Sequence, residues 1–302
     1  MSIFLFVMSK ERDWHTYNEA LVRRGELELD SSVIEEWNRE LKKENDGKVG
    51  EPYHYPESYI RLLAFVRLLF HMPYRETEGF VHFLSKHIEG LKVPDYSTID
   101  RRTNKLDVRL DESLVESNSP VTIAVDSSGI KVHNGGDWIR HVWKVKRGYL
   151  KIHLAVDARS KQAVSLQVTE ESVSDGSQME PHVQEAMSKN KVGRAYADGA
   201  YDSRANFNFL AFNKIDPAIK VRKNAVPKAK GSFARKEAVI EQQRDFEGWK
   251  KEKGYGDRWA AEGAFSCIKR IFGEYVSARK FVNMAREMAM KASIYNRFIT
   301  TT

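Results

Sequence analysis

Near the C-terminus, apolar and polar residues recur with the period of an amphipathic helix between residues 255 and 269 (YGDRWAAEGAFSCIK). At about 100° per residue, one unbroken helix over this stretch would have two distinct faces. Its buried face would consist of apolar residues, namely Ala261, Ala264, Phe265, Ile268, Ile271 and Phe272. The adjoining face, an arc of about 80°, would present Tyr255, Arg258, Glu262, Ser266 and Lys269. A charged face with an Arg–Glu pair is usually only a solvated surface, so its function depends on what else lies nearby.

Helical patterns also dominate the first hundred residues. Residues 9–50 are mostly polar, with one capped helix expected from residue 32 to about residue 43. An apolar helix begins after Pro56 and is broken at Pro73. A second helix is expected over about residues 76–88.

Asp95 is placed to N-cap a third helix, which is basic. The residues of this helix that would face phosphates or base edges are Arg101, Arg102 and Lys105. Short helices with a tight polar turn before a basic helix fit a helix-turn-helix that reads the major groove of DNA. The alternative is a plain helical bundle with a solvated basic face. The pattern alone favours this bundle over the helix-turn-helix.

From Pro120 onward the pattern becomes that of β-strands. Residues 121–134 (VTIAVDSSGIKVHN) predict a strand that ends at Asp126, a turn at residues 127–129 and a second short strand. Residues 151–169 predict two further strands joined by a turn at residues 157–161. Three adjacent strands with tight turns indicate an antiparallel meander.

The remaining chain alternates helices and strands. A helix is expected near residues 180–188, and then a strand that ends at Asp198, with another helix after Asp202. Residues 216–221 are expected to form a short strand, and residues 237–253 a polar helix. In the C-terminal run, Met284, Met288, Ala292, Tyr295 and Ile299 have helical spacing and are interpreted as core residues.

Two segments are strongly basic. The aromatic and cationic stretch from residue 138 to residue 151 (WIRHVWKVKRGYLK) contains Lys144, Lys146 and Arg147. Residues 220–236 contain seven Lys or Arg and no acidic residue, which predicts a flexible basic loop. Such a loop is either ordered by a polyanion, through residues such as Lys228 and Lys230, or remains a solvated surface.

Composition narrows the class of protein. A length of 302 residues favours about two domains. The net charge of +7 favours a polyanionic partner, nucleic acid first. The one cysteine, Cys267, permits no internal disulfide and no cysteine-based zinc site. No signal peptide or membrane span is recognisable, so we expect a soluble cytoplasmic protein, associated with the nucleoid. There is also no HExxH, GxxxxGK[ST] or GxSxG motif, so neither zinc, ATP nor a serine nucleophile is implied.

Three acidic residues are candidates for one site. Asp126 and Asp198 each end a predicted apolar strand (IAVD and AYAD), and Glu262 lies on the amphipathic helix. If they meet at one sheet edge, their repulsion requires cations. Two Mg²⁺ or Mn²⁺ ions, about 3.5–4 Å apart, would suit oxygen ligands and phosphoryl transfer. Asp157 repeats the pattern (HLAVD) but leads directly into a hairpin turn, so we rank it below Asp126.

Tyr255, Arg258, Glu262 and Lys269 reproduce the pattern Tyr, two residues, Arg, three residues, Glu, six residues, Lys. Together with AVDSSG around Asp126, YADGAYDS around Asp198 and the stretch HLAVD…VSDGSQMEP, this pattern resembles the DDE transposases of bacterial and archaeal insertion sequences. The resemblance extends from about residue 53 to the C-terminus.

The resemblance implies an α/β fold with an RNase H-like core, a mixed sheet flanked by helices, preceded by an all-helical domain. We expect a polar, helical extension over residues 1–50 and a helix-turn-helix-like DNA-binding domain over residues 51–115. The catalytic domain would span residues 116–302 and include the basic loop 220–236.

The resemblance also implies a reaction. The protein would cleave at the terminal inverted repeats of its element, free 3′-hydroxyls and join them to target DNA. Asp126, Asp198 and Glu262 would be the catalytic residues and ligate the two metal ions. Tyr255, Arg258 and Lys269 would contact DNA near the cleaved phosphate.

The implied partners are double-stranded DNA, both transposon ends and target, and a second copy of the chain when two ends are paired. No membrane and no nucleotide cofactor are expected. Two alternatives stay open: a domesticated DNA-binding protein without catalysis, and an RNase H-like nuclease outside transposition.

Overall fold

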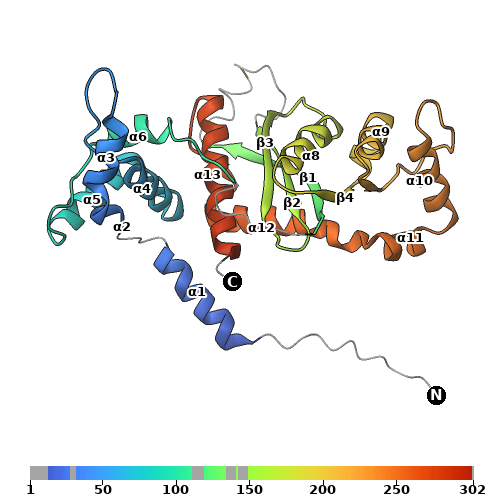
Figure 1. The fold of residues 1–302 in the computed structure, drawn as a ribbon, viewed down its shortest axis with the longest axis horizontal. Helices are drawn as coiled ribbons and strands as arrows, with labels where there is room; N and C mark the ends of the chain where they lie inside the picture. Colours follow the sequence, from blue (N-terminus) through green and yellow to red (C-terminus); the bar gives the residue numbers. More distant parts are fainter. Residues whose placement is uncertain (1–12, 28–31, 111–118, 134–140, 142–148, 301–302) are drawn as a thin grey trace. The chain divides into compact units, whose positions relative to one another are not determined.

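The computed structural model describes residues 13–27, 32–110, 119–133, 141 and 149–300 (Figure 1). Main-chain contacts divide the chain into two compact units. One comprises residues 1–67, 72–103 and 300–302, and the other comprises residues 68–71 and 104–299. Among the described helices, none combines the length and apolar character that crossing a bilayer requires.

The N-terminal unit is helical. Its helices are α1 (Trp14–Leu27), α2 (Ser32–Glu35), α3 (Trp37–Asn45), α4 (Glu57–Leu69), α5 (Tyr74–Ser85) and α6 (Tyr96–Thr103). Their shared core is formed by Trp37, Tyr59, Leu63, Val81 and Ile99. Helix α3 therefore packs with the helices that follow residue 50. Helix α1 was not predicted.

The segment before α6 contains the predicted N-cap. Asp95 N-caps α6 as predicted, because its carboxylate accepts the backbone N–H groups of Ser97 (2.9 Å) and Thr98 (3.0 Å). The hydroxyls of the same two residues, and then these backbone bonds, lower the pKa of Asp95. Residues 86–95 connect α5 to α6 and include a turn in which the N–H of Leu91 donates to the carbonyl of Ile88 at 3.3 Å. The helix-turn-helix itself stays a prediction. Helix α6 ends at Thr103, and Lys105 lies beyond it.

The second unit is built on a mixed sheet. Its strands are β1 (Val121–Val132), β2 (Tyr149–Asp157), β3 (Ala163–Glu170), β4 (Val192–Ala197), β5 (Asp216–Ile219) and β6 (Tyr275–Val276). The order is β3-β2-β1-β4-β5, with β6 paired to the far end of β1. Strand β2 is antiparallel to β1 and β3, whereas β4 and β5 run parallel to β1. This mixed sheet flanked by helices agrees with the predicted α/β fold class.

The predicted turn at residues 127–129 is wrong, because β1 continues through it. Ser127, Ser128 and Gly129 pair with His153, Ile152 and Lys151 of β2. Gly129 lies against the ring of Tyr149 on the neighbouring strand. A Cβ at position 129 would lie only 3.1 Å from Cδ2 of this ring. Gly129 therefore permits close approach of a cross-strand aromatic side chain and does not make a turn.

Helices cover both faces of this sheet (Figure 1). On one face lie α8 (Met179–Met187), α9 (Arg204–Phe212) and the 3₁₀ turns η2 (Asp175–Gln178) and η3 (Gly199–Tyr201). The core there includes Ile123, Val125, Met179, Val183 and Phe207. On the other face lie α12 (Trp259–Phe272) and α13 (Phe281–Thr300).

Two predicted helices differ in detail. The polar helix over residues 237–253 is in fact two helices, α10 (Phe233–Arg244) and α11 (Phe246–Lys253). The break lies at Asp245, whose carboxylate caps α11 by accepting the N–H of Gly248 at 2.9 Å. The core assignment for α13 is confirmed at Met284, Met288, Ala292 and Tyr295, all of which are buried.

Candidate functional site

Asp126 and Asp198 occupy equivalent positions on two neighbouring parallel strands. Pairing of β1 with β4 ends at Ala124 and Tyr196, and each aspartate follows two residues later. Because side chains alternate along a strand, both carboxylates lie on the same face as Ala124 and Tyr196. Asp198 stands at the end of its strand, as predicted, and caps η3 by accepting the N–H of Ala200 at 2.8 Å. Asp126 does not end a strand, because β1 continues to Val132.

Glu262 reaches this face of the sheet from α12. The predicted apolar face of α12 is buried at Ala261, Ala264, Phe265, Ile268 and Phe272. Packing of this face orients the opposite side of the helix outward, and the Glu262 side chain is 43% exposed. Helix α12 stops at Gly273, whose φ of 76° is open to glycine but strained for other residues.

The prediction of one helix over residues 255–269 is wrong in its first turn. Residues Tyr255–Arg258 form the 3₁₀ turn η4, and α12 begins at Trp259. Gly254, in the left-handed conformation (φ 62°), ends α11 and starts this turn. The tighter winding rotates Tyr255 away from the charged face and into the interior.

Tyr255 is accordingly a buried residue. Its hydroxyl donates to the carbonyl of Ala197 at 3.0 Å, and its ring contacts Trp249 and Tyr196. Burial raises the pKa of Tyr255 to about 12, so it stays a neutral donor. The phenol is thereby occupied in holding the end of β4, next to Asp198.

Arg258 links two of the three acids. Its Nη2 donates to Oε1 of Glu262 at 2.5 Å, and its Nη1 lies 3.8 Å from Oδ2 of Asp126. The Arg258 side chain is only 17% exposed. One guanidinium therefore serves two carboxylates, and the third, Asp198, is not among its partners in the described part of the chain.

The charges of the three acids act on one another. Burial raises the pKa of Asp126 above its ordinary value. The backbone N–H of Ser127 and the Arg258 guanidinium oppose this increase, whereas the charges of Asp198 and Glu262 add to it. The sheet and α12 thus bring the three predicted acids into one electrostatic cluster, which is short of positive charge.

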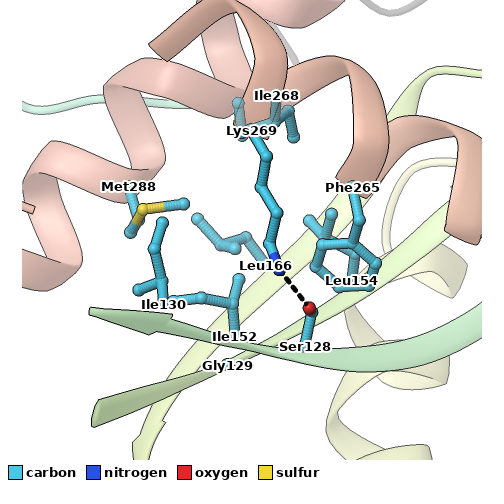
Figure 2. Close-up of a pocket in the computed structure, with 11 residues that line it drawn as sticks. Ser128, Gly129, Ile130, Ile152, Leu154, Leu166, Phe265, Ile268, Lys269 and Met288 are labelled. Atoms are coloured by element: carbon cyan, nitrogen blue, oxygen red, sulfur yellow. Dashed lines mark hydrogen bonds between the residues drawn. The ribbon is translucent and has the colours of Figure 1, made fainter. Parts of the chain in front are cut away.

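Lys269 is held beside this cluster by an internal contact. Its Nζ donates to Oγ of Ser128 at 2.8 Å, two residues beyond Asp126 on the same face of β1. Figure 2 shows its aliphatic stem descending from α12 into an apolar pocket that Leu154, Leu166 and Phe265 help to line. The ammonium thereby ties α12 to β1, and with it Glu262 to Asp126.

Asp157 forms the predicted hairpin turn. Its carboxylate accepts the N–H groups of Arg159 and Ser160 and the hydroxyl of Ser160. These bonds leave Asp157 as a turn-former between β2 and β3, which agrees with its lower rank.

The basic loop 220–236 is hydrogen-bonded to neighbouring helices at three points. The side chain of Gln242 accepts the N–H of Val221, and those of Gln243 and Asn208 donate to the carbonyls of Ala225 and Gly231. Lys228 and Lys230 are exposed. Polar side chains of α9 and α10 thus bind the loop backbone, and the flexibility of the loop stays a prediction.

The other predicted DNA contacts have different surroundings. Arg101 is exposed on α6. Arg102 is half-buried, where its guanidinium donates to the carbonyl of Tyr55 (3.0 Å) and to Glu44 (3.3 Å) and stacks on Tyr53. Lys105 is exposed beyond the helix. The remaining three residues, Lys144, Lys146 and Arg147, lie outside the described residues.

One ion pair beside the acids was missed. Asp202, in the same motif as Asp198, is bound by Arg235 through Nε (2.6 Å) and Nη2 (2.9 Å), and its side chain is fully buried. The motif YADGAYDS predicts a helix after Asp202 and gives no sign of an ion pair. No spacing rule connects it to an arginine at the far end of the basic loop.

The donor set is suited to hard divalent cations, which prefer carboxylate oxygens. Across the described residues, however, no three Asp, Glu, His or Cys side chains are grouped closely enough to hold one ion. Arg258 lies against two of the three carboxylates and balances part of their charge.

Comparison with known proteins identifies two matching family models. Residues 117–297, more than half of the chain, match a family model described as a transposase DDE domain. Residues 22–135 match a second model with the same description. A cryo-EM structure of a piggyBac transposase synaptic complex with hairpin DNA is a distant structural likeness, with a TM-score of 0.40 and 11% sequence identity. That match covers 93% of this chain and 74% of the other.

Proposed function

The chain belongs to the DDE transposase family, and from this premise we propose that it cuts the ends of its own insertion sequence and joins them to target DNA. It binds the terminal inverted repeats, cleaves to free 3′-hydroxyls and transfers those strands. Asp126, Asp198 and Glu262 are the catalytic residues in this proposal.

The observation that carries the proposal is the shared position of the three acids. Two lie at the same register of neighbouring parallel strands, and the third faces them from α12. The raised pKa of Asp126, caused by burial and then by the other two acids, supports a cluster built to receive positive charge.

We assign the binding of Mg²⁺ or Mn²⁺ to these three carboxylates, because all are oxygen donors and α12, which carries Glu262, lies over the sheet face of Asp126 and Asp198. When bound, two such ions would activate the attacking oxygen and stabilise the leaving oxygen at phosphorus. The remaining residues position this centre: Tyr255 holds the end of β4, and Lys269 holds α12 to β1. Arg258 orients Glu262, and its positive charge offsets part of the repulsion between Glu262 and Asp126.

DNA is the partner in this proposal. The net charge of +7, exposed Arg101 and Lys105, and Lys228 and Lys230 on the basic loop support contacts with phosphates. Arg102 is better explained as a structural residue, because Glu44 and Tyr55 already bind its guanidinium. A second copy of the chain is required whenever two transposon ends are brought together.

End cleavage on the flanking repeats tests the proposal. With Mg²⁺, the wild-type protein should nick at the transposon end, and Glu262→Ala and Asp126→Ala should lose at least roughly a thousandfold of the rate. Both variants should still bind the repeat DNA in EDTA. Glu252→Ala, which removes an exposed acid from α11, is the control and should cleave like the wild type.

The same experiment separates the alternatives. Binding without cleavage by the wild type would support a domesticated DNA-binding protein. Cleavage of hybrid or branched substrates without any preference for the repeat sequence would support an RNase H-like nuclease outside transposition. If Glu262→Ala cleaves as fast as the wild type, Glu262 is not part of the centre.

A further inference from the structure

The cations beside the three acids differ in how many of their hydrogen-bond donors are already in use. Arg258 is engaged by Glu262 and Asp126, and the ammonium of Lys269 donates to Ser128. Arg222, at the start of the basic loop, is exposed, and among the described residues its side chain donates through Nε to the carbonyl of Gly199 at 3.1 Å. No carboxylate of the described residues lies within ion-pair distance of Arg222.

Arg222 is also fixed next to Asp198. The N–H of Lys220 donates to the carbonyl of Ala197 at 3.1 Å, so the chain after β5 runs beside the end of β4. The stem of Arg222 then lies over Gly199, where a Cβ would be 3.9 Å from its Cγ. Gly199 directly follows Asp198, so the guanidinium is held along the turn that carries this acid.

A buried ion pair secures that position. Oδ2 of Asp202 accepts the backbone N–H of Arg222 at 3.0 Å, in addition to the two N–H groups of Arg235. Asp202 thus joins three parts of the chain. These are the turn after Asp198, the start of the basic loop at Arg222, and helix α10, which carries Arg235. This buried carboxylate anchors the three segments, because losing Arg235 would leave its charge unpaired and losing a single N–H group would leave an oxygen without a hydrogen bond.

We propose that Arg222 binds a DNA phosphate on the Asp198 side of the three acids, and that Asp202 and Arg235 are positioning residues that hold it there. The Nη groups of an arginine can bind a phosphate in a bidentate manner while Nε remains on a carbonyl. The inference rests on the proposed function, since it names a further residue that contacts the substrate DNA of the same centre.

The test measures DNA binding in EDTA, so that cleavage does not interfere. Arg222→Ala should bind the terminal repeat roughly tenfold more weakly. Its slope of log K against log salt concentration should fall by about 0.9, the value for one lost phosphate contact. Lys191→Ala is the charge-matched control, because it removes an exposed cation at the opposite end of β4. Its salt slope should lie closer to that of the wild type than the slope of Arg222→Ala does.

A neutral-phosphate scan locates the contact. Single methylphosphonates are placed at successive positions of the transposon end, and one of them should weaken binding of the wild type but not of Arg222→Ala. Arg235→Lys, which loses the bidentate pair, should weaken binding in a manner that is not additive with Arg222→Ala. Thermal unfolding of each variant checks that it is folded.

The outcomes distinguish this inference from the proposed function. If the wild type neither binds nor cleaves the repeats, the proposed function fails. If the wild type does both, but Arg222→Ala shows the same salt slope and the same methylphosphonate pattern as the wild type, Arg222 does not contact the DNA and the inference is overturned.

Discussion

Two clusters of arginine and carboxylate lie near the end of β4, and their charges are paired to very different degrees. In the first, Asp202 is fully buried and accepts three N–H groups, two from Arg235 and one from the backbone of Arg222. In the second, Arg258 is the cation of the described residues that pairs with both Asp126 and Glu262, and Glu262 is 43% exposed. One cluster has every charge paired, and the other has an excess of negative charge.

This difference separates structural residues from candidate catalytic residues. A buried carboxylate whose donors are all supplied by the protein has no remaining capacity for a ligand. Carboxylates that repel one another and keep one side open retain oxygen lone pairs for a cation. The contrast predicts opposite responses to substitution in the two clusters.

The largest effect is expected in the fully paired cluster of Asp202 and Arg235. Asp202→Asn would remove the charge that neutralises Arg235 and should destabilise the protein by about 3 kcal/mol, because breaking a buried pair leaves the partner charge uncompensated. For a domain of this size, the melting temperature should fall by about 6–12 °C. Differential scanning calorimetry measures this, with Asp257→Asn, an exposed acid on η4, as the matched control. A melting temperature equal to that of the control would show that the pair adds nothing to stability.

An intermediate effect is expected for Tyr255→Phe. Its hydroxyl is satisfied by Ala197 and so belongs with the structural groups, although the sequence pattern associates it with DNA. The variant should lose about 1 kcal/mol of unfolding free energy and keep the wild-type salt slope of DNA binding. Urea denaturation and salt-dependent binding measure the two quantities. A reduced salt slope of DNA binding with unchanged stability would show that Tyr255 contacts DNA.

The smallest effect is expected in the cluster of Asp126, Glu262 and Arg258. Here a substitution should raise the free energy of unfolding instead of lowering it. Burial and the neighbouring acids raise the folded-state pKa of Asp126 above the unfolded value of about 3.9. A raised pKa means that the group stabilises the fold below the unfolded pKa and that this contribution is lost as pH rises through the folded pKa. Asp126→Asn should therefore be more stable than the wild type at pH 7, by less than about 1 kcal/mol.

The pH dependence of that gain provides the check. The advantage of Asp126→Asn should shrink as the pH is lowered towards 4, because the wild-type carboxyl then becomes protonated. Thermal unfolding between pH 4 and pH 7 measures the difference. A wild type that is more stable than the variant at pH 7 would contradict the description of this cluster as short of positive charge.

Much of this arrangement was predictable because it follows local rules. The strand that ends at Asp198, the Asp95 cap and the hairpin at Asp157 depend on residues close in sequence. The apolar face of α12 follows from its period. The three acids were found through strand ends, helical spacing and the resemblance to a known family.

The errors arose where distant contacts decide the local structure. Ser127–Gly129 has turn-forming composition, but pairing with β2 keeps it extended, and the Tyr149 ring explains the glycine. Tyr255 was placed on a charged helical face, whereas a 3₁₀ turn directs it to Ala197. The bond between Asp202 and Arg235 spans 33 residues and has no sequence pattern of its own.

The matched register of Asp126 and Asp198 has a consequence for how the sequence can vary. The spacing of these two acids is set by main-chain pairing between β1 and β4 and depends little on the side chains around them. Substitutions that keep the volume of the core should therefore leave this spacing unchanged, whereas insertion of one residue into β4 would move Asp198 to the opposite face of the sheet. The number of residues between the paired segment and each acid is, in this sense, as strictly constrained as the identity of the acids themselves.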